Sequence, residues 1–280
     1  MKLQLEQDLP LLDALALLSP GSSKTTLRSW LKDERVCVDG KVEKIGSKMI
    51  HKNQVITVGG KPPRTVEGLQ ILYEDSHIVV IDKPSGLLSV ASAFEKGKTA
   101  HAILKNYYRP RKVFVVHRID QETSGVMLFA LSEVAYERLK VMFEEHDLSR
   151  EYRAILEGQL SPKTGTWQSY LFEDENYYVR ETTNPAEGRL AITHYEVVEA
   201  NKNHSMVKFI LETGRKNQIR VHCKAAGHPI VGDIKYGSIL SQARRLCLHA
   251  HKLGFKHPLT VKSMQFESSL PKEFNRFKHA

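Results

Sequence analysis

The 280-residue chain has no stretch that approaches the roughly 18 consecutive apolar residues that a membrane-spanning helix needs. Acidic side chains stand in residues 1–18, where a secretory signal would carry basic ones. The three cysteines, Cys37, Cys223 and Cys247, are odd in number and too widely spaced for a disulfide framework. These absences predict a soluble, cytoplasmic protein that has reduced thiols and no membrane partner.

Motifs for cofactors are missing as well. The sequence contains no Gly-x-Gly-x-x-Gly loop and no Walker-type loop, so nucleotide binding through such a loop is not expected. Cys223 and Cys247 have histidine neighbours, but the lack of any Cys-x-x-Cys pair argues against a zinc site. We therefore expect no cofactor and no metal.

The chain has 41% hydrophobic and 26% charged residues, which is typical of a folded protein. Negative charge is outnumbered by positive charge at both ends of the chain. Residues 201–280 hold 15 Lys and Arg against 4 Asp and Glu, and residues 1–64 hold 11 against 7. Residues 65–200 instead hold 15 against 21. Basic ends around an acidic middle indicate a polyanionic partner such as nucleic acid, although a uniformly solvated basic surface would give the same sum.

Residues 59–64, Gly-Gly-Lys-Pro-Pro-Arg, concentrate turn formers and predict a domain boundary. We expect a small domain at 1–60, a linker at 61–70 and a large domain at 71–280.

A helix predicted at 23–34 has two different faces. Leu27, Trp30 and Leu31 fall on one side at helical spacing, so this side should pack against the small domain. A charged helical face is ordinarily only solvated, and RNA binding does not follow from it alone. The candidates for RNA binding, which repeat every four residues on another side, are Lys24, Arg28 and Lys32.

The rest of the small domain should hold a helix at 9–18, with Asp8 as its N-cap, and strands at 35–38 and 54–58. The run 35–42, Arg-Val-Cys-Val-Asp-Gly-Lys-Val, leads into a hairpin with an Asp-Gly turn. Taken together, residues 8–58 resemble an S4-type RNA-binding domain. The resemblance implies that the basic helix contacts RNA.

The large domain should be an α+β domain. Apolar and β-branched runs predict strands at 78–81, 126–129, 152–156 and 206–211. A helix should begin after Ser132 as N-cap and end near 145. Another should follow Asn217 and end before Gly227, and the polar stretch 173–188 should form an exposed loop or hairpin.

The segment 117–125, His-Arg-Ile-Asp-Gln-Glu-Thr-Ser-Gly, separates two apolar strands and must therefore form a loop at the end of a sheet. Asp120 lies there beside a cation and several hydroxyl and amide groups, where an ionised carboxylate can act as nucleophile or base. These are also ordinary turn residues. Glu122, two positions away, raises the alternative of a two-carboxylate glycosidase.

A family resemblance favours the catalytic interpretation of this loop. Residues 117–125 resemble the signature of the RluA-type pseudouridine synthases. Further segments resemble its other motifs, in chain order: the first motif, Asp-Lys-Pro-Ser-Gly-Leu, at 82–87, the second, Arg-Glu-Tyr-Arg-Ala, at 150–154, and the third, Thr-Gly-Arg-Lys-Asn-Gln-Ile-Arg-Val-His, at 213–222, followed by Gly-Asp-Ile-Lys-Tyr-Gly at 232–237 and Leu-His-Ala at 248–250. The resemblance implies a mixed, mainly antiparallel sheet of the pseudouridine synthase type.

The resemblance also implies roles for individual residues. Asp120 matches the catalytic aspartate, which attacks C1′ or C6 or assists a glycal route, and Arg220 matches the arginine that would hold it through a bidentate contact. Tyr152 matches the tyrosine that stacks on the target base, although a tyrosine opening a strand is more often simple packing. Further substrate contacts are expected from Arg118, which enters the RNA stack, and from His117, Ile219 and Leu248.

One motif departs from the family pattern. The third motif more often reads Gly-Arg-Thr-His-Gln, whereas this chain has Lys216 and Asn217, so a contact made by the histidine is absent or replaced. The predicted function is that of a monomeric enzyme that converts uridines in structured RNA to pseudouridine, with large-subunit ribosomal RNA favoured over transfer RNA. The alternatives are a base-excising glycosylase and an inactive RNA-binding module.

Overall fold

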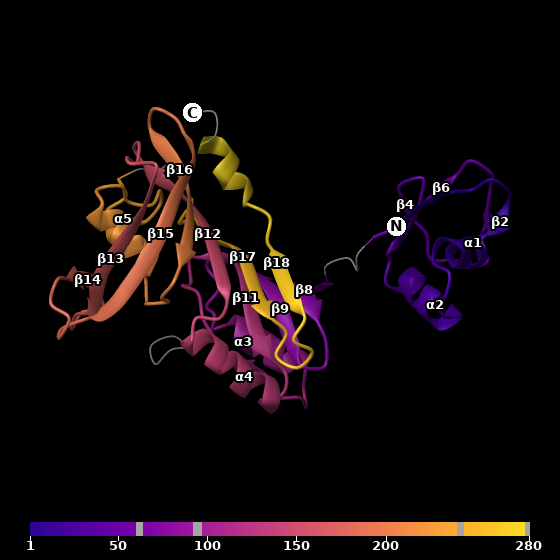
Figure 1. Cartoon of the computed structure of the whole chain (residues 1–280), viewed down its shortest axis with the longest axis horizontal. Coiled ribbons are helices and arrows are strands. Elements are labelled where there is room, and N and C mark those ends of the chain that lie inside the picture. Colours follow the sequence, from indigo (N-terminus) through magenta and orange to yellow (C-terminus); the bar gives the residue numbers. More distant parts are fainter. Residues whose placement is uncertain (60–63, 92–96, 240–243, 278–280) are drawn as a thin grey trace. The chain divides into compact units, whose positions relative to one another are not determined.

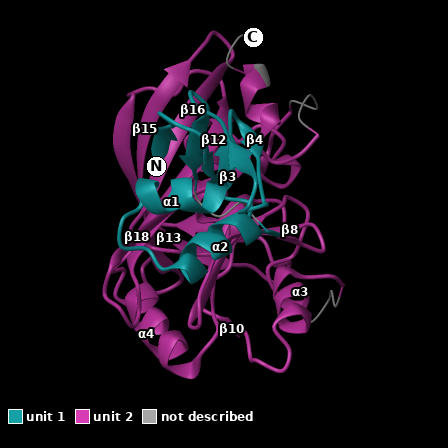
Figure 2. Ribbon diagram, turned by 90° about the vertical axis from the view of Figure 1, so that its right-hand side faces the viewer, with its two compact units in different colours: residues 1–64 teal, residues 65–280 magenta. Residues whose placement is uncertain are grey.

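Residues 1–64 and 65–280 form separate units in the computed structural model (Figure 2). The structure describes residues 1–59, 64–91, 97–239 and 244–277. Most of the predicted boundary turn, at 60–63, lies outside the described residues. The segment predicted as a linker at 61–70 contains strand β7 (Arg64–Val66) and the beginning of strand β8 (Leu69–Glu74), so regular structure resumes earlier than expected.

Two helices of unit 1 bury their apolar faces in its core. Helix α2 (Lys24–Lys32) begins after Ser23, whose hydroxyl accepts a hydrogen bond from the Thr26 backbone. As predicted, the helix buries Leu27, Trp30 and Leu31. Helix α1 (Leu11–Leu18) also forms, but the N-cap predicted at Asp8 is wrong. The Asp8 carboxylate instead accepts hydrogen bonds from the His51 ring and the Lys52 backbone, while Pro10 occupies the cap position.

The strands of unit 1 form a small antiparallel sheet. The hairpin predicted at Asp39 and Gly40 is present, and both residues have positive φ, as a tight two-residue turn requires. The sheet order is β1 (Lys2–Gln4), β6 (Val55–Val58), β3 (Val36–Val38) and β4 (Lys41–Val42), while β2 (Leu9–Pro10) pairs with β5 (Met49–Ile50).

Unit 2 is built on one large mixed sheet, which confirms the predicted fold class (Figure 1). Strand β11 pairs with β17 in parallel, and the pairs that link β8 to β9, β9 and β10 to β11, β12 to β16 and β17, β13 to β14 and β15, β15 to β16, and β17 to β18 are antiparallel. The predicted strands and helices form with small shifts of their ends. Besides β7 and β8, the strands are β9 (Ile78–Lys83), β10 (Phe114–Val115), β11 (Ser124–Ala130), β12 (Ser149–Glu157), β13 (Thr164–Glu173), β14 (Val179–Thr182), β15 (Arg189–Ala200), β16 (His204–Leu211), β17 (Leu248–Lys256) and β18 (Ser263–Glu267).

Helices cover both faces of strands β9 and β11, which matches the apolar runs at 78–81 of β9 and 126–130 of β11. Helix α3 (Ala100–Tyr107) packs in one apolar cluster with Val79 and Phe129, and helix α4 (Glu133–Glu144) packs in another with Val80 and Leu128. Neighbouring residues of a strand point to opposite faces, so both sets are buried. The covered strands provide a rigid base for the loop at 116–123, which connects β10 to β11.

The other half of the sheet carries helix α5 (Gln218–Ala225), which buries Ile219, Val221 and Cys223 against strands β12–β16. Short 3-10 helices follow at η1 (Ile234–Tyr236) and η2 (Lys272–Phe277). Within the described residues, no helix is both long enough and apolar enough to cross a bilayer.

Candidate active site

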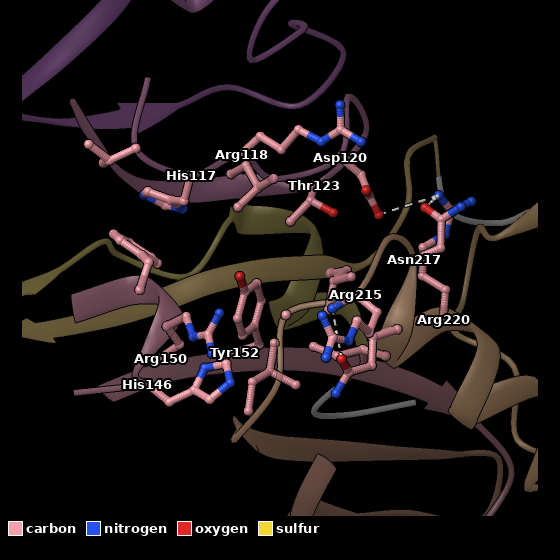
Figure 3. A pocket seen from close by; sticks show the side chains of 18 of the residues that line it. His117, Arg118, Asp120, Thr123, His146, Arg150, Tyr152, Arg215, Asn217 and Arg220 are labelled. Carbon is pink, nitrogen blue, oxygen red and sulfur yellow. Dashed lines mark hydrogen bonds and ion pairs between the residues drawn. The ribbon is translucent and has the colours of Figure 1, made fainter. Parts of the chain in front are cut away.

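A cavity of about 530 Å³ opens in unit 2 between the 116–123 loop, strand β12 and the start of helix α5 (Figure 3). Its lining brings together side chains from segments far apart in the sequence. The unit 2 residues predicted as site residues all line it: His117, Arg118, Asp120, Tyr152, Ile219, Arg220 and Leu248. The three remaining candidates, Lys24, Arg28 and Lys32, lie exposed on α2 in unit 1.

Asp120 lies in the loop directly before β11 and points across the cavity to Arg220 (Figure 3). The carboxylate is 29% exposed, and its Oδ2 lies 3.6 Å from Nη1 of Arg220. Burial raises the pKa of Asp120 above its ordinary value, while the positive charges of Arg220 and Arg118 act in the opposite direction. Asp120 is therefore a partly desolvated carboxylate with a cation at one side.

The prediction of a bidentate contact between Arg220 and Asp120 is wrong. Arg220 forms its bidentate pair with Asp233 instead, donating from Nε and Nη2 at 2.7 Å each. The side chain of Asp233 is fully buried, and its position just before η1 lets it also accept from the Tyr236 backbone. A fully buried carboxylate needs a paired cation, which explains why the guanidinium turns toward Asp233 rather than the partly exposed Asp120.

Asn217 occupies one of the two positions, with Lys216, at which the sequence departs from the family motif. It has a φ of +53°, a left-handed conformation that asparagine tolerates better than most residues, and it is the N-cap of α5. Its Oδ1 accepts from Nη1 of Arg220 at 3.1 Å, and its Nδ2 donates to the Tyr236 hydroxyl at 3.0 Å. Asn217 thus binds the guanidinium that faces Asp120.

Tyr152 stands at the opposite side of the cavity from Arg118, near the start of β12 (Figure 3). The pairing of β12 with β17 is irregular between Glu151 and Tyr152, and such irregularities often redirect a side chain beside a functional site. Burial raises the pKa of Tyr152, with the negative charge of Asp120 adding to the effect. The phenol therefore remains neutral and presents an uncharged ring to the cavity.

Arg150, two residues earlier, is a buried cation beside that ring. Its Nη2 donates to the carbonyl oxygen of Glu212, whereas its Nε has no hydrogen-bond partner in the part of the chain that the structure describes. With Arg118, Lys140 and Arg215 it gives the cavity a cationic lining, which suits an anionic substrate.

His117 lines the cavity but already uses one ring nitrogen. Its Nε2 accepts a hydrogen bond from the Leu128 backbone at 2.9 Å, and its ring stacks on Phe143 with centroids 4.6 Å apart. Burial, together with the nearby charge of Arg150, lowers the pKa of His117 to about 3. The neutral ring therefore anchors the loop to β11 and leaves only its other nitrogen for a ligand.

Lys83 is fully buried beneath the loop. Its ammonium donates to the carbonyl oxygens of Pro84, Leu87 and Gln121, so it ties the 82–87 motif to the loop of Asp120. Burial lowers the pKa of Lys83 to about 7, against the attraction of Glu122 and Asp120. The sequence showed this lysine within a motif but contained no local signal for its three carbonyl partners.

Two other features bear on alternative chemistry. Glu122 is exposed and is not among the residues that line the cavity, so it does not form a carboxylate pair with Asp120 there. The described residues contain no group of three or more His, Cys, Asp and Glu side chains arranged to hold a metal ion.

Comparisons with known proteins agree on one family. Residues 77–225 match the family model described as RNA pseudouridylate synthase. The chain is 33% identical over 262 residues to the uncharacterized RNA pseudouridine synthase YhcT of Bacillus subtilis, covering 89% of this chain and 86% of the relative. It is 33% identical over 285 residues to ribosomal large subunit pseudouridine synthase D of Pseudomonas aeruginosa, covering 92% and 88%. The solved structure of human RNA pseudouridylate synthase domain containing 4 has the same fold, with a TM-score of 0.63 and 23% identity over 75% of this chain and 91% of that one.

Proposed function

The chain belongs to the RluA-type RNA pseudouridine synthases, and from this premise we propose that it isomerises specific uridines of large-subunit ribosomal RNA by base flipping and Asp120-dependent catalysis. Pseudouridine formation in RNA is the activity of the family. The choice of ribosomal RNA is supported by relatives named as ribosomal large subunit pseudouridine synthase D, among them the protein of Escherichia coli O6:H1, which is 32% identical over 285 residues.

The position of Asp120 carries the proposal. The reaction breaks the bond between N1 of uracil and C1′ of ribose, turns the base and forms a bond between C5 and C1′, with the C5 proton lost and N1 protonated. Atoms and electrons balance without an added oxidant or reductant, so one carboxylate can serve as the reacting group. Asp120 meets this need because its carboxylate reaches the cavity and its ionic contact with Arg220 is long, at 3.6 Å.

The rest of the cavity suits a uridine that has left its stack. A volume of about 530 Å³ lies in the range of small-molecule sites. We infer that the neutral ring of Tyr152 stacks on the uracil and that Ile219 and Leu248 form its apolar wall. Flipping a base costs a few kcal/mol of stacking, which the planar cation of the exposed Arg118 can offset by filling the gap.

Unit 1 is proposed as an S4-like RNA-binding domain. Lys24, Arg28 and Lys32 stand exposed on one helix whose opposite side is buried, so the three charges are available to phosphate groups without loss of packing. Contacts from a second unit would add affinity for a large structured RNA.

The decisive experiment maps pseudouridines in total RNA from cells with and without this gene. The proposal predicts that one or a few positions in large-subunit ribosomal RNA lose the modification and regain it when the purified protein acts on that RNA. Loss confined to transfer RNA would overturn the choice of substrate. Release of free uracil would favour a glycosylase, and bound RNA without modification would favour an inactive binding module.

A further inference from the structure

Two carboxylates compete for the guanidinium of Arg220. Asp233 receives two hydrogen bonds of 2.7 Å from Nε and Nη2, whereas Asp120 lies 3.6 Å from Nη1. Bidentate pairs between arginine and a carboxylate fix orientation and are stronger than single contacts. The positive charge of Arg220 is therefore committed mainly to Asp233, although Asp120 is the residue exposed to the cavity.

The surroundings of Arg220 keep it in this orientation. Asn217 takes a hydrogen bond from Nη1, the same nitrogen that faces Asp120, and the Tyr236 ring lies 4.8 Å from the guanidinium carbon. Tyr236 is itself held by the Asn217 side chain through its hydroxyl and by the Asp233 carboxylate through its backbone. Rotation of Arg220 toward Asp120 would break several of these contacts at once.

We propose that Asp233 is a positioning residue for the reaction: together with Asn217 it holds Arg220 back from full pairing with Asp120, so that the Asp120 carboxylate stays available to react. The inference rests on the proposed function, in which Asp120 is the reacting group. A carboxylate whose two oxygens were both engaged by the arginine would be a weaker nucleophile and a weaker base. Arg220 then orients Asp120 without neutralising it.

The electrostatic effects on Asp120 are consistent with this role. Burial raises the pKa of Asp120, Arg220 lowers it, and the negative charge of Asp233 raises it again. Removing the Asp233 charge and releasing Arg220 toward Asp120 should both lower the pKa of Asp120. The other charged or titratable groups that act on Asp120 are Arg118 on its own loop, Lys83 on β9, Tyr152 on β12 and Lys235 in η1.

The test measures single-turnover rates of pseudouridine formation against pH for the wild type and Asp233→Asn. The variant should lose about tenfold or more in the plateau rate, because small displacements of reacting groups are costly. Its acid limb should move to lower pH, because a carboxylate with a lower pKa stays ionised in more acidic solution. A purely structural role for Asp233 would lower thermal stability and leave the acid limb in place.

Asp75→Asn is the matched control. Asp75 is a partly buried carboxylate that accepts hydrogen bonds from the Tyr73 hydroxyl and from the backbone of His77 and Ile78, and it is not among the residues lining the cavity. Its replacement should cost stability without moving the acid limb.

Asn217→Gly provides a second variant that keeps the left-handed backbone while removing both side-chain hydrogen bonds. It should move the acid limb in the same direction, by less, because Nη1 then loses its hydrogen bond to Asn217 and keeps its contact with Asp120. A wild type that forms no pseudouridine would overturn the proposed function itself. If the wild type is active and the folded variants keep its acid limb, the role of Asp233 is overturned and the proposed function is not.

Discussion

A Cβ atom added to Gly125 would lie 2.1 Å from the carbonyl oxygen of Ala250, closer than any side chain can approach. The two residues pair across the parallel contact between β11 and β17, and Gly125 has a φ of +116°. On its other side, Ala250 pairs with Tyr152 in β12. Strand β17 therefore lies between β11, which follows the Asp120 loop, and β12, which carries Tyr152.

Gly125→Ala should destabilise unit 2 by about 3 kcal/mol or more, because the new methyl group meets backbone that cannot move aside and the residue has an unfavourable φ. Gly68→Ala is the control: Gly68 also has a positive φ, of +86°, but a Cβ there would meet nothing within 4 Å. The control should cost only about 1 kcal/mol. Denaturant unfolding measures both, and equal losses would show that the approach of β11 to β17 is not tight.

Asp120→Asn should abolish pseudouridine formation, because it removes the charged carboxylate that the reaction needs. Folding and RNA affinity should stay near normal, because the size of the side chain is kept. Glu122→Gln serves as the control, since Glu122 does not line the cavity and the variant should retain substantial turnover. The readout is pseudouridine yield on a target RNA, beside a folding check and a binding assay. Wild-type turnover by Asp120→Asn would remove Asp120 from the mechanism.

Lys83→Met should destabilise unit 2 by roughly 2 kcal/mol or more, because the three carbonyl oxygens bound by the ammonium lose their buried donor. The loss should depend on pH. In the folded protein the pKa of Lys83 is lowered to about 7, whereas a lysine in the unfolded chain titrates near its ordinary value of about 10.4. Between these values the unfolded chain binds more protons, so the stability conferred by this residue rises with pH.

The margin by which the wild type exceeds Lys83→Met should accordingly widen between about pH 6 and about pH 9, by at most about 1.4 kcal/mol per pH unit. Lys105→Met, a change on the exposed face of α3, should show no such trend. Denaturation midpoints across this range measure the margin. A constant margin would mean that Lys83 titrates normally, and a margin that shrinks with rising pH would mean that its pKa is raised in the folded protein; either result would contradict the prediction.

Replacing Lys24, Arg28 and Lys32 with glutamine should weaken RNA binding and leave both units folded, because the three side chains are exposed. Each lost phosphate contact should flatten the slope of log K against log salt by roughly 0.7 for single-stranded RNA. The control replaces Lys44 and Lys48, whose charges are paired with Glu34 and Glu43. An unchanged slope and affinity in the triple variant would show that this helix does not contact the substrate.

Much of the fold could be predicted because its determinants lie within a few residues of one another. The apolar runs at 78–81 in β9 and 126–130 in β11 indicate strands, and Ser23 and Ser132 each accept a backbone hydrogen bond at the start of their helices. The motif around Asp120 likewise identified the loop that reaches the cavity. At Asp8 the local sequence wrongly indicated an N-cap, because the Asp8 carboxylate binds the His51 ring and the Lys52 backbone instead of the start of the helix.

The sequence by itself thus determined the elements, the family and the residues that gather at the cavity. The tertiary structure decided which of them pair: Arg220 binds Asp233 more closely than Asp120, and His117 gives one ring nitrogen to the Leu128 backbone. Nothing in a linear pattern distinguishes one aspartate from another as partner of an arginine. Burial makes the difference, because the fully buried Asp233 carboxylate must be neutralised, whereas the partly exposed Asp120 need not be.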